Sequence, residues 1–499
     1  MKTKLHLVLI ITLFSITSFA QNIHFIKSYG NSGYDFGRDI KQDLDTGYVA
    51  TGSSSSFSSG TADAFLLKVD SLGNFMWSYN YGGQETDWGE SVVVTHDSSY
   101  AIGGYTNSFG AGGFDFYLVR ADRNGTPLWE KTYGGGDWDR AHSIIQLADS
   151  GFVLVGDTYS YGNGNADIYM VRTDKNGDTL WTRTYGGTED DFGNAVILDG
   201  DSLVVVGGTE SFGNGMSDGI ILKYHIDGTF GWSKVVGEDK DDYFTSIAIN
   251  SQQKYLFGGS KNYGHFMDCD CGQNFWLYET DKFGNLIVDG GWNGEDLGVD
   301  IVNDVIFQTN TTYLFGGLTS SWGTAGSQPG DKDLYIGKKI SGGGNQFYAP
   351  YAEVFGHTEN DEIRAIDLAF DNGIIAIGNL NYNSIGGANL IIVKIEKNST
   401  PGNIDVIVDL TQENITLSFE ELISKENLKV YPTLFTNHIT IEGLPEKNII
   451  KLYNNSGKLV FESFNKNLNN VDLSYLSKGL YILKIQTNEL SVTRKIIKN

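Results

Sequence analysis

Hydrophobic and polar residues alternate in short runs along most of the chain. In residues 91–133 the runs SVVVTH, SYAIGGYT, DFYLVRAD and PLWEKTY follow one another, separated by segments rich in Gly, Asn, Asp and Ser. Alternation of this kind is typical of β-strands with one buried face, and such separators are typical of tight turns. The pattern predicts an all-β fold with four short strands per segment.

The four-strand segment repeats along the chain. YGNSGYD, YGGQETD, YGGGDWD and YGGTEDD begin at Tyr29, Tyr81, Tyr133 and Tyr185, a constant spacing of 52 residues (81−29, 133−81 and 185−133). A looser copy begins at Val236, and two more end at Asp300 and Asp361, which makes seven. Repeats with four strands each favour a propeller over a solenoid. We therefore predict a seven-bladed β-propeller over residues 21–398.

The two ends of the repeat region complement each other. The seventh copy stops after NLIIVKIEKN (residues 389–398) and lacks its fourth strand. HFIKSYG (residues 24–30) aligns with the fourth-strand sequence LWEKTYG (residues 128–134) position for position. We expect the N-terminal strand to complete the last blade and close the ring, because closure removes exposed sheet edges.

Two kinds of glycine-rich loop are expected on one rim of the propeller, because strand direction alternates within a blade. Loops from a fourth to a first strand supply one aspartate per copy: Asp35, Asp87, Asp139, Asp191, Asp242, Asp300 and Asp361. Loops from a second to a third strand supply Asp63, Asp115, Asp167, Asp218 and Asp333, with Asn274 and Asn389 in the remaining copies. A ring of carboxylates requires hydrogen bonds or a shared cation. The favoured interpretation is that each aspartate accepts bonds from N–H groups of its own loop; calcium is the alternative, and no other cofactor is predicted.

Aromatic side chains accompany these aspartates, among them Trp88 and Trp138. They are interpreted either as a platform for a glycan or protein ligand or as wedges between blades. The seven first-loop aspartates and these two tryptophans form the predicted binding rim.

The opposite face carries a different motif, D-x-x-G-x-x-x-W, which starts at Asp70, Asp122 and Asp174. It predicts a hairpin from the third to the fourth strand with an Asx turn, a glycine and a tryptophan that docks on a neighbouring blade. The tryptophans are Trp77, Trp129 and Trp181, with Trp232 as a fourth equivalent. The spacing is similar to the tryptophan-docking motif of quinoprotein dehydrogenases.

Charge and the absence of catalytic motifs narrow the function. Asp and Glu outnumber Lys and Arg by 61 to 36, a formal charge of −25, which argues against a nucleic-acid partner. Cys269 and Cys271 are not the adjacent pair of a quinoprotein and are interpreted as an exposed loop pair. The arginines show no recurrence at one blade position, which argues against a sialidase-like site; they are Arg38, Arg120, Arg123, Arg140, Arg172, Arg183 and Arg364. We predict a binding module, with an oxidoreductase, a glycan-active hydrolase or a structural surface component as alternatives.

The N-terminus predicts export. Lys2 and Lys4 precede an apolar stretch at residues 5–19 that is short for a membrane span, and small residues precede a cleavage site after Ala20. We assign residues 1–20 to a signal peptide and expect no transmembrane segment in the rest of the chain.

The repeats resemble the seven-bladed propeller repeat family often called SBBP. DFYLVRADRNG, YGGGDWD and GGYTNS match its strand ending before a turn glycine, its GG-aspartate loop and its G-x-T-x-S segment. The resemblance covers residues 22–398 and implies a fold more firmly than an activity.

Residues 428–499 form a separate module after a linker at residues 399–427. Alternating runs with turn signals predict a small antiparallel β-sandwich. The module resembles the type A sorting domain of the type IX secretion system of Bacteroidota. The matching residues include Tyr431, Pro432, Gly457, Gly479, Tyr481, Lys495 and Lys498. The start YPTLF departs from the usual YPNPF. The resemblance implies that the type IX machinery is a partner and that the mature protein is secreted or held on the outer cell surface.

Overall fold

The computed structural model describes most of residues 23–498. The residues inside this range that it does not describe are 31–32, 57, 59, 263–272, 293–298, 321–331, 341–351, 356–360, 383–386, 396–428, 432–433, 436–437, 443–447, 455–457, 465–470 and 488–490. The predicted signal peptide and linker, Cys269, Cys271, Pro432 and Gly457 therefore lie outside the described residues. The described part contains no helix, and so none that is long and apolar enough to cross a membrane.

Seven four-stranded antiparallel sheets occur among the described residues. The first contains β2 (Asp35–Gln42), β3 (Tyr48–Ser54), β4 (Asp63–Val69) and β5 (Phe75–Tyr81). The second contains β6 (Asp87–Val94), β7 (Tyr100–Thr106), β8 (Asp115–Ala121) and β9 (Pro127–Tyr133). The third contains β10 (Asp139–Gln146), β11 (Phe152–Thr158), β12 (Asp167–Thr173) and β13 (Thr179–Tyr185). The fourth contains β14 (Asp191–Asp199), β15 (Ser202–Thr209), β16 (Asp218–His225) and β17 (Phe230–Val236).

The remaining three sheets follow the same order of strands. The fifth contains β18 (Asp242–Ile249), β19 (Tyr255–Lys261), β20 (Asn274–Thr280) and β21 (Leu286–Trp292). The sixth contains β22 (Asp300–Phe307), β23 (Thr312–Thr319), β24 (Asp333–Ile340) and β25 (Ala352–Phe355). The seventh contains β26 (Glu362–Leu368), β27 (Ile374–Tyr382), β28 (Gly387–Ile395) and, as its outermost strand, β1 (Ile23–Tyr29). The predicted all-β fold of repeated four-stranded sheets is confirmed.

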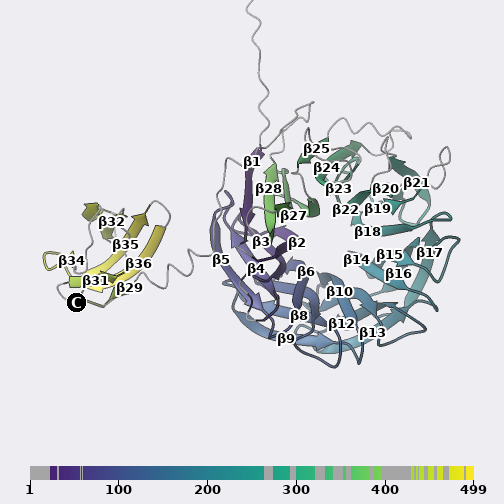
Figure 1. Cartoon of the computed structure of the whole chain (residues 1–499), viewed down its shortest axis with the longest axis horizontal. Helices are drawn as coiled ribbons and strands as arrows, with labels where there is room; N and C mark the ends of the chain where they lie inside the picture. The colour runs from purple at the N-terminus through teal and green to yellow at the C-terminus, as the bar shows by residue number, and fades with distance from the viewer. Residues whose placement is uncertain are drawn as a thin grey trace, which may run out of the picture.

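The sheets follow one another around a common centre in a propeller-like arrangement, with the first strand of each sheet innermost (Figure 1). Each first strand contacts the first strand of the next sheet, from β2 and β6 through to β22 and β26, and β2 also contacts β26. β1 pairs with β28 in the register Tyr29↔Leu390 and Ile26↔Val393. This is the pairing that the alignment of HFIKSYG with LWEKTYG predicts.

Burial differs from the simple alternation that the sequence suggests. The second and third strands of the first three sheets are buried at nearly every position, whereas first strands alternate and fourth strands are partly exposed. The reason is that a middle strand lies between two neighbouring sheets and needs apolar residues on both faces. Cores of this kind join adjacent sheets, as where Leu66 and Tyr81 of the first sheet pack with Ile102 and Tyr117 of the second.

The C-terminal module contains two sheets in the described residues. One consists of β29 (Lys429–Tyr431), β31 (His438–Glu442) and β34 (Val471–Asp472). The other consists of β30 (Leu434–Phe435), β36 (Ser491–Lys498), β35 (Gly479–Thr487), β32 (Asn448–Asn454) and β33 (Leu459–Phe464). The prediction of purely antiparallel pairing is wrong at one place, because β30 pairs with β36 in parallel. These strands are separated by most of the module, so no tight turn imposes an antiparallel pair.

Candidate functional site

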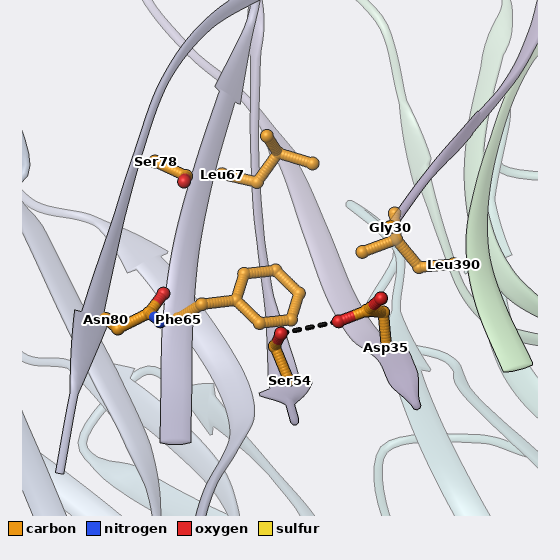
Figure 2. A pocket seen from close by; sticks show the side chains of 8 residues that line it. All are labelled: Gly30, Asp35, Ser54, Phe65, Leu67, Ser78, Asn80 and Leu390. Carbon is orange, nitrogen blue, oxygen red and sulfur yellow. Dashed lines mark hydrogen bonds between the residues drawn. The ribbon is translucent and has the colours of Figure 1, made fainter. Parts of the chain in front are cut away.

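The seven rim aspartates are buried, each exposing 2% or less of its surface. Asp139 shows one way in which they are held: its Oδ1 accepts a bond from the Thr158 hydroxyl, and its Oδ2 accepts bonds from the Ser160 hydroxyl at 2.7 Å and the Gly135 N–H at 2.8 Å. Asp87 has the same three partners in Thr106, Ser108 and Gly83, and Figure 2 shows Ser54 directed at Asp35. The T-x-S segment and the GG-aspartate loop of the repeat therefore meet as one clamp.

The second-loop aspartates reach the same rim, as the parity of the strands predicts. Asp115 accepts a bond from the N–H of Ala111 at 2.7 Å. A Cβ placed on Gly134 would lie 2.0 Å from Asp115 Oδ1 and 2.6 Å from Asp139 Oδ2, so this glycine separates two carboxylates of adjacent sheets. Burial, opposed by the bond from Ala111 and assisted by the charge of Asp139, raises the pKa of Asp115. Within the described residues no group of three or more His, Cys, Asp or Glu side chains is placed to hold a metal ion.

The substitution Thr158→Val tests whether the hydrogen bond from the Thr158 hydroxyl to Asp139 stabilises the fold. The substitution keeps the β-branched shape but removes the hydroxyl that Asp139 Oδ1 accepts, leaving a buried carboxylate oxygen without that partner. We expect the free energy of unfolding to fall by about 1–3 kcal/mol in denaturant titrations. Thr184→Val, on the exposed strand β13, is the control and should change stability little. An equal effect of the two substitutions would contradict the bracing role.

Asp242 departs from the clamp. It accepts bonds from the N–H groups of Glu238 at 2.7 Å and Asn262 at 2.8 Å, but the position of the threonine, 19 residues further on, is occupied by Lys261. Burial, with a smaller contribution from the charge of Asp218, raises the pKa of Asp242 to about 6. The rim aspartates are thus chemically unequal although the sequence repeats them.

The raised pKa of Asp242 predicts a pH dependence of stability. The Asp242 carboxyl group binds its proton more tightly in the folded state than in the unfolded state. Protonation of Asp242 therefore stabilises the fold fully below about pH 4, and this stabilisation is lost as the pH rises through about 6. Asp242→Asn resembles the protonated acid, so we expect its melting temperature, relative to the parent protein, to be higher at about pH 7.5 than at about pH 4.5. Asp201→Asn, at an exposed turn, is the control. A difference for Asp242→Asn that does not vary with pH would contradict the assignment.

The hairpins on the opposite face dock between sheets. A Cβ on Gly125, which has φ +82°, would lie 2.6 Å from Cζ3 of Trp77 in the preceding sheet, and the Tyr81 hydroxyl donates a bond to the Gly125 carbonyl at 2.5 Å. The same contact joins Trp129 to Gly177, Trp181 to Gly228 and Trp232 to Gly284. Phe25 on β1 takes the tryptophan position against Gly73, and Tyr29 donates a bond to the Gly73 carbonyl at 2.6 Å. The predicted docking motif is therefore a tie between blades.

A central channel with a volume of about 760 Å³ lies among the first strands. Each first strand contains a β-bulge: in β2, Gly37 pairs with Gly52 and Asp39 with Thr51, which leaves Arg38 unpaired between them. The same shift occurs in β6, β10, β14, β18, β22 and β26. A bulge re-aims one side chain, and every bulged residue lines the channel. These residues are Arg38, Glu90, His142, Asn194, Thr245, Asn303 and Arg364.

A glycine in each second strand makes room for the bulge. In the third sheet a Cβ on Gly156 would lie 1.8 Å from the carbonyl oxygen of Arg140. Across the seven sheets the corresponding distance is between 1.7 and 2.1 Å, at Gly52, Gly104, Gly156, Gly207, Gly259, Gly317 and Gly378. The conformation that lines the channel thus depends on a residue of the adjacent strand.

The charged half of the channel is formed by the seventh, first, second and third sheets. Arg38 Nε lies 3.6 Å from Glu90 Oε1, and Arg364 Nε donates to Glu362 Oε1 at 2.7 Å. This corrects the prediction that arginines share no blade position, because Arg38 and Arg364 occupy the same bulge in neighbouring sheets. Each arginine lies three residues after the aspartate of its loop, Asp35 or Asp361, so the sequence shows the shared spacing. The bulge shows why this spacing matters, because it directs both side chains into the channel.

His142 belongs to a polar cluster at the channel wall that is centred on the buried Asp157. Its Nε2 lies 2.6 Å from Asp157 Oδ1, and Arg140 donates to Asp157 Oδ2 at 2.9 Å. Burial opposes ionisation of Asp157, but the hydrogen bond from His142 and the charge of Arg140 outweigh it and lower the pKa of Asp157. Asp157 therefore holds the imidazole in place and leaves Nδ1 as its second polar atom.

The two predicted rim tryptophans lie in different surroundings. Trp88, half-buried, stacks on Phe36 at 5.7 Å and on Tyr105 at 6.1 Å between ring centroids. Trp138 is 49% exposed and meets Phe114 edge-on at 5.8 Å. Trp88 thus serves as a wedge between sheets, whereas Trp138 is half exposed at the rim, with the Arg140 guanidinium over its ring at 5.8 Å from the centroid.

A second polar cluster of the channel ties first strands together. Asp39 Oδ2 accepts a bond from the N–H of Val92 in the next sheet at 2.9 Å. Asp304 accepts bonds from the Ser246 hydroxyl at 2.6 Å and from the N–H of Ile366 at 2.9 Å, and burial raises its pKa to about 6. These carboxylates bridge neighbouring sheets and so support the channel wall.

A second cavity near the rim, among the described residues, is much smaller than the channel. The cavity drawn in Figure 2, beside Gly30, Asp35 and Leu390, has a volume of about 10 Å³. That is room for about one water molecule.

Two of the predicted sorting residues have structural partners. Lys498 is buried, and its ammonium donates to the carbonyls of Leu473 and Ser474, each at 2.7 Å. The Tyr481 hydroxyl donates to the carbonyl of Ser477 at 2.7 Å. Both side chains secure the turn after β34. Tyr431, Gly479 and Lys495 lie in β29, β35 and β36.

Residues 429–499 match the family described as a secretion system C-terminal sorting domain. The domain indicates export by type IX secretion to the cell surface or the surrounding medium. A curated relative, the regulatory protein FlaEY of Caulobacter vibrioides, is 27% identical over 178 residues, which is 30% of this chain and 18% of that protein. The chain thus matches less than a fifth of that relative.

Solved structures similar to this chain are distant. PorZ, a surface component of the type IX secretion system of Porphyromonas gingivalis, is 12% identical with a TM-score of 0.41 over 94% of this chain and 60% of its own. The β-propeller domain of the trilobed protease of Pyrococcus furiosus is 11% identical with a TM-score of 0.41 over 75% and 98%. An ulvan lyase of polysaccharide lyase family PL25 is 10% identical with a TM-score of 0.45 over 74% and 96%. Likeness at this level carries no argument about function.

Proposed function

We propose that this protein is a binding module for glycan or protein ligands, displayed on the cell surface or released after type IX secretion. In this proposal residues 21–398 form a seven-bladed propeller closed by β1, and residues 428–499 form a sandwich that directs sorting. The ligand enters the central channel from the rim that carries Trp138.

One observation carries the binding role: the seven bulge positions hold differing side chains in one repeated backbone setting. Clamp positions repeat an aspartate with a threonine or serine hydroxyl in the first, second, third and sixth sheets, and docking positions repeat a tryptophan in the first four sheets, because they do the same structural task there. The bulges instead supply two arginines, a glutamate, a histidine, two asparagines and a threonine around a channel of about 760 Å³. A volume of this size with few convergent polar groups is typical of a ligand site.

A second candidate, an enzyme, is favoured by the contact of His142 with Asp157. A histidine held by a buried carboxylate is a common arrangement for proton transfer. Turnover that is lost in His142→Gln while binding persists would favour this candidate over a pure binding module.

The test uses the full chain expressed in its host and the secreted product purified from it. Removing residues 429–499 should retain the protein in the periplasm, and normal secretion of the truncated chain would contradict the sorting role. The purified product is then applied to an array of glycans and to immobilised surface proteins. The absence of binding to both would contradict the proposed function.

A further inference from the structure

We propose that the charged half of the channel binds the carboxylate of an acidic saccharide, with Arg38 and Arg364 as the anion-binding pair. This inference rests on the proposed function and specifies its ligand.

The two guanidinium groups are brought together by the fold. They project from equivalent bulges of β2 and β26, strands that contact each other around the channel. Burial and then the charge of Arg38 lower the pKa of Arg364, which places the two cations near each other in a poorly solvated region. Burial opposes ionisation of Arg38, but the charge of Glu90 helps to outweigh it and the pKa of Arg38 is raised. An anion that bridges both arginines would therefore add to carboxylates already beside them.

The glutamates leave the outer nitrogens available. Arg38 and Arg364 each meet a glutamate through Nε, at 3.6 Å and 2.7 Å. Their side chains retain 19% and 33% exposure, so the guanidinium edges remain open to the channel. A planar guanidinium presents its remaining N–H groups as a fork that matches a carboxylate.

Arg38 is held rigidly for this task. Its guanidinium lies over the ring of Trp88, 4.7 Å from the centroid, and Trp88 is fixed between Phe36 and Tyr105. A cation that is already oriented loses little conformational entropy when it binds an anion.

The rest of the site fits a saccharide. Asn194, Thr245 and Asn303 line the other half of the channel, where each already donates to a main-chain carbonyl, and their side-chain oxygens can accept bonds from sugar hydroxyls. Exposed aromatic rings at the rim, Tyr34 at 59% and Trp138 at 49%, offer faces for the C–H side of a sugar ring. A net charge of −25 disfavours long polyanions, so the cationic patch suits a ligand with few, spaced carboxylates.

The experiment is calorimetric titration of the purified secreted product at low ionic strength. The probes are oligosaccharides of galacturonate, glucuronate and mannuronate, the neutral oligosaccharides of galactose, glucose and mannose, and sodium acetate. We expect at least one acidic oligosaccharide to bind at least about tenfold more tightly than its neutral counterpart, acetate to bind too weakly to measure, and added salt to weaken the binding.

The variants locate the site. Arg38→Gln and Arg364→Gln should each weaken binding of the acidic oligosaccharide at least about tenfold, and Arg364→Lys should weaken it less. Trp138→Ala should weaken binding of the sugar without changing its salt dependence. Arg123→Gln, at an exposed hairpin on the opposite face, is the matched control and should bind as the parent does. Melting temperatures identify any variant that fails to fold. In that case the binding affinities of Trp138→Ala and Arg364→Lys decide whether the site is located correctly.

Failure of this inference is distinguishable from failure of the proposed function. Equal affinity for neutral and acidic oligosaccharides, or unchanged affinity in both arginine variants, would overturn the inference while leaving a binding module. Acetate binding as tightly as the oligosaccharide would show an anion site without saccharide recognition and would also overturn it. If the glycan array, the immobilised proteins and all the saccharides show no binding, the proposed function fails together with this inference.

Discussion

Gly156→Ala is expected to lower the free energy of unfolding of the propeller by at least about 3 kcal/mol, the upper end for overpacking in a core. The added Cβ would lie 1.8 Å from the carbonyl oxygen of Arg140 and 2.8 Å from Cα of Ala141. Both are backbone atoms of β10, so no side-chain rotation relieves the clash. Either β10 separates from β11 or the bulge that directs His142 into the channel is lost.

Gly136→Ala is the matched control, because an added Cβ there meets no atom within 4 Å. Denaturant unfolding of both variants measures the difference, and hydrogen exchange locates it. We expect faster exchange of the amides in β10 and β11 for Gly156→Ala alone. Similar stability of the two variants would show that the second-strand glycines are not required for the bulges.

Phe25→Ala is expected to lower the free energy of unfolding by about 3–5 kcal/mol, the range for removing a buried aromatic ring. Phe25 is 8% exposed, packs against Gly73 and meets Tyr48 edge-on at 6.2 Å. It lies on β1, the only strand that joins the start of the repeat region to β28 within the described residues. Its loss therefore weakens the junction between the seventh and first sheets as well as the core.

Phe283→Ala is the control for this prediction, since Phe283 is 72% exposed. It lies in the hairpin of the fifth sheet that corresponds to the Gly73 hairpin of the first sheet. Phe25→Trp provides a second comparison, because tryptophan occupies the aligned position in the first four sheets. We expect Phe25→Ala to expose the β28 amides to exchange and Phe25→Trp to retain their protection. Unchanged protection of β28 in Phe25→Ala would mean that the junction between the seventh and first sheets does not depend on the Phe25 side chain.

Much of the fold could be predicted because its signals are local and repeated. The period of 52 residues located Asp35, Asp87, Asp139 and Asp191 at the starts of first strands, and the structure has these strands beginning at those residues. Pairing of β1 with β28 followed from one aligned heptapeptide. The docking hairpins followed from an Asx turn and a glycine, which act within a few residues.

The candidate site was less predictable for a physical reason. A repeated sequence reveals the positions that hold the same residue in the copies. The most regular of these are the rim aspartates, which are buried and brace their loops. The channel is lined by the position that differs from copy to copy, so no pattern marked it. The loop pattern predicts Trp138 as a rim residue, but it gives no sign that Arg38 and Arg364 are structurally equivalent.

The sequence by itself determined the strands, their grouping into four, the loop N–H groups that bond the aspartates and the strand that joins the two ends, because each depends on residues close in the chain or on one repeated motif. Only the tertiary structure decided the parallel pairing of β30 with β36, the burial of middle strands on both faces, and the bulges that turn Arg38, His142 and Arg364 toward a common channel. Those features depend on contacts between sheets: a bulge forms where a glycine of the next strand leaves room, and a channel exists only when all the inner strands surround one centre.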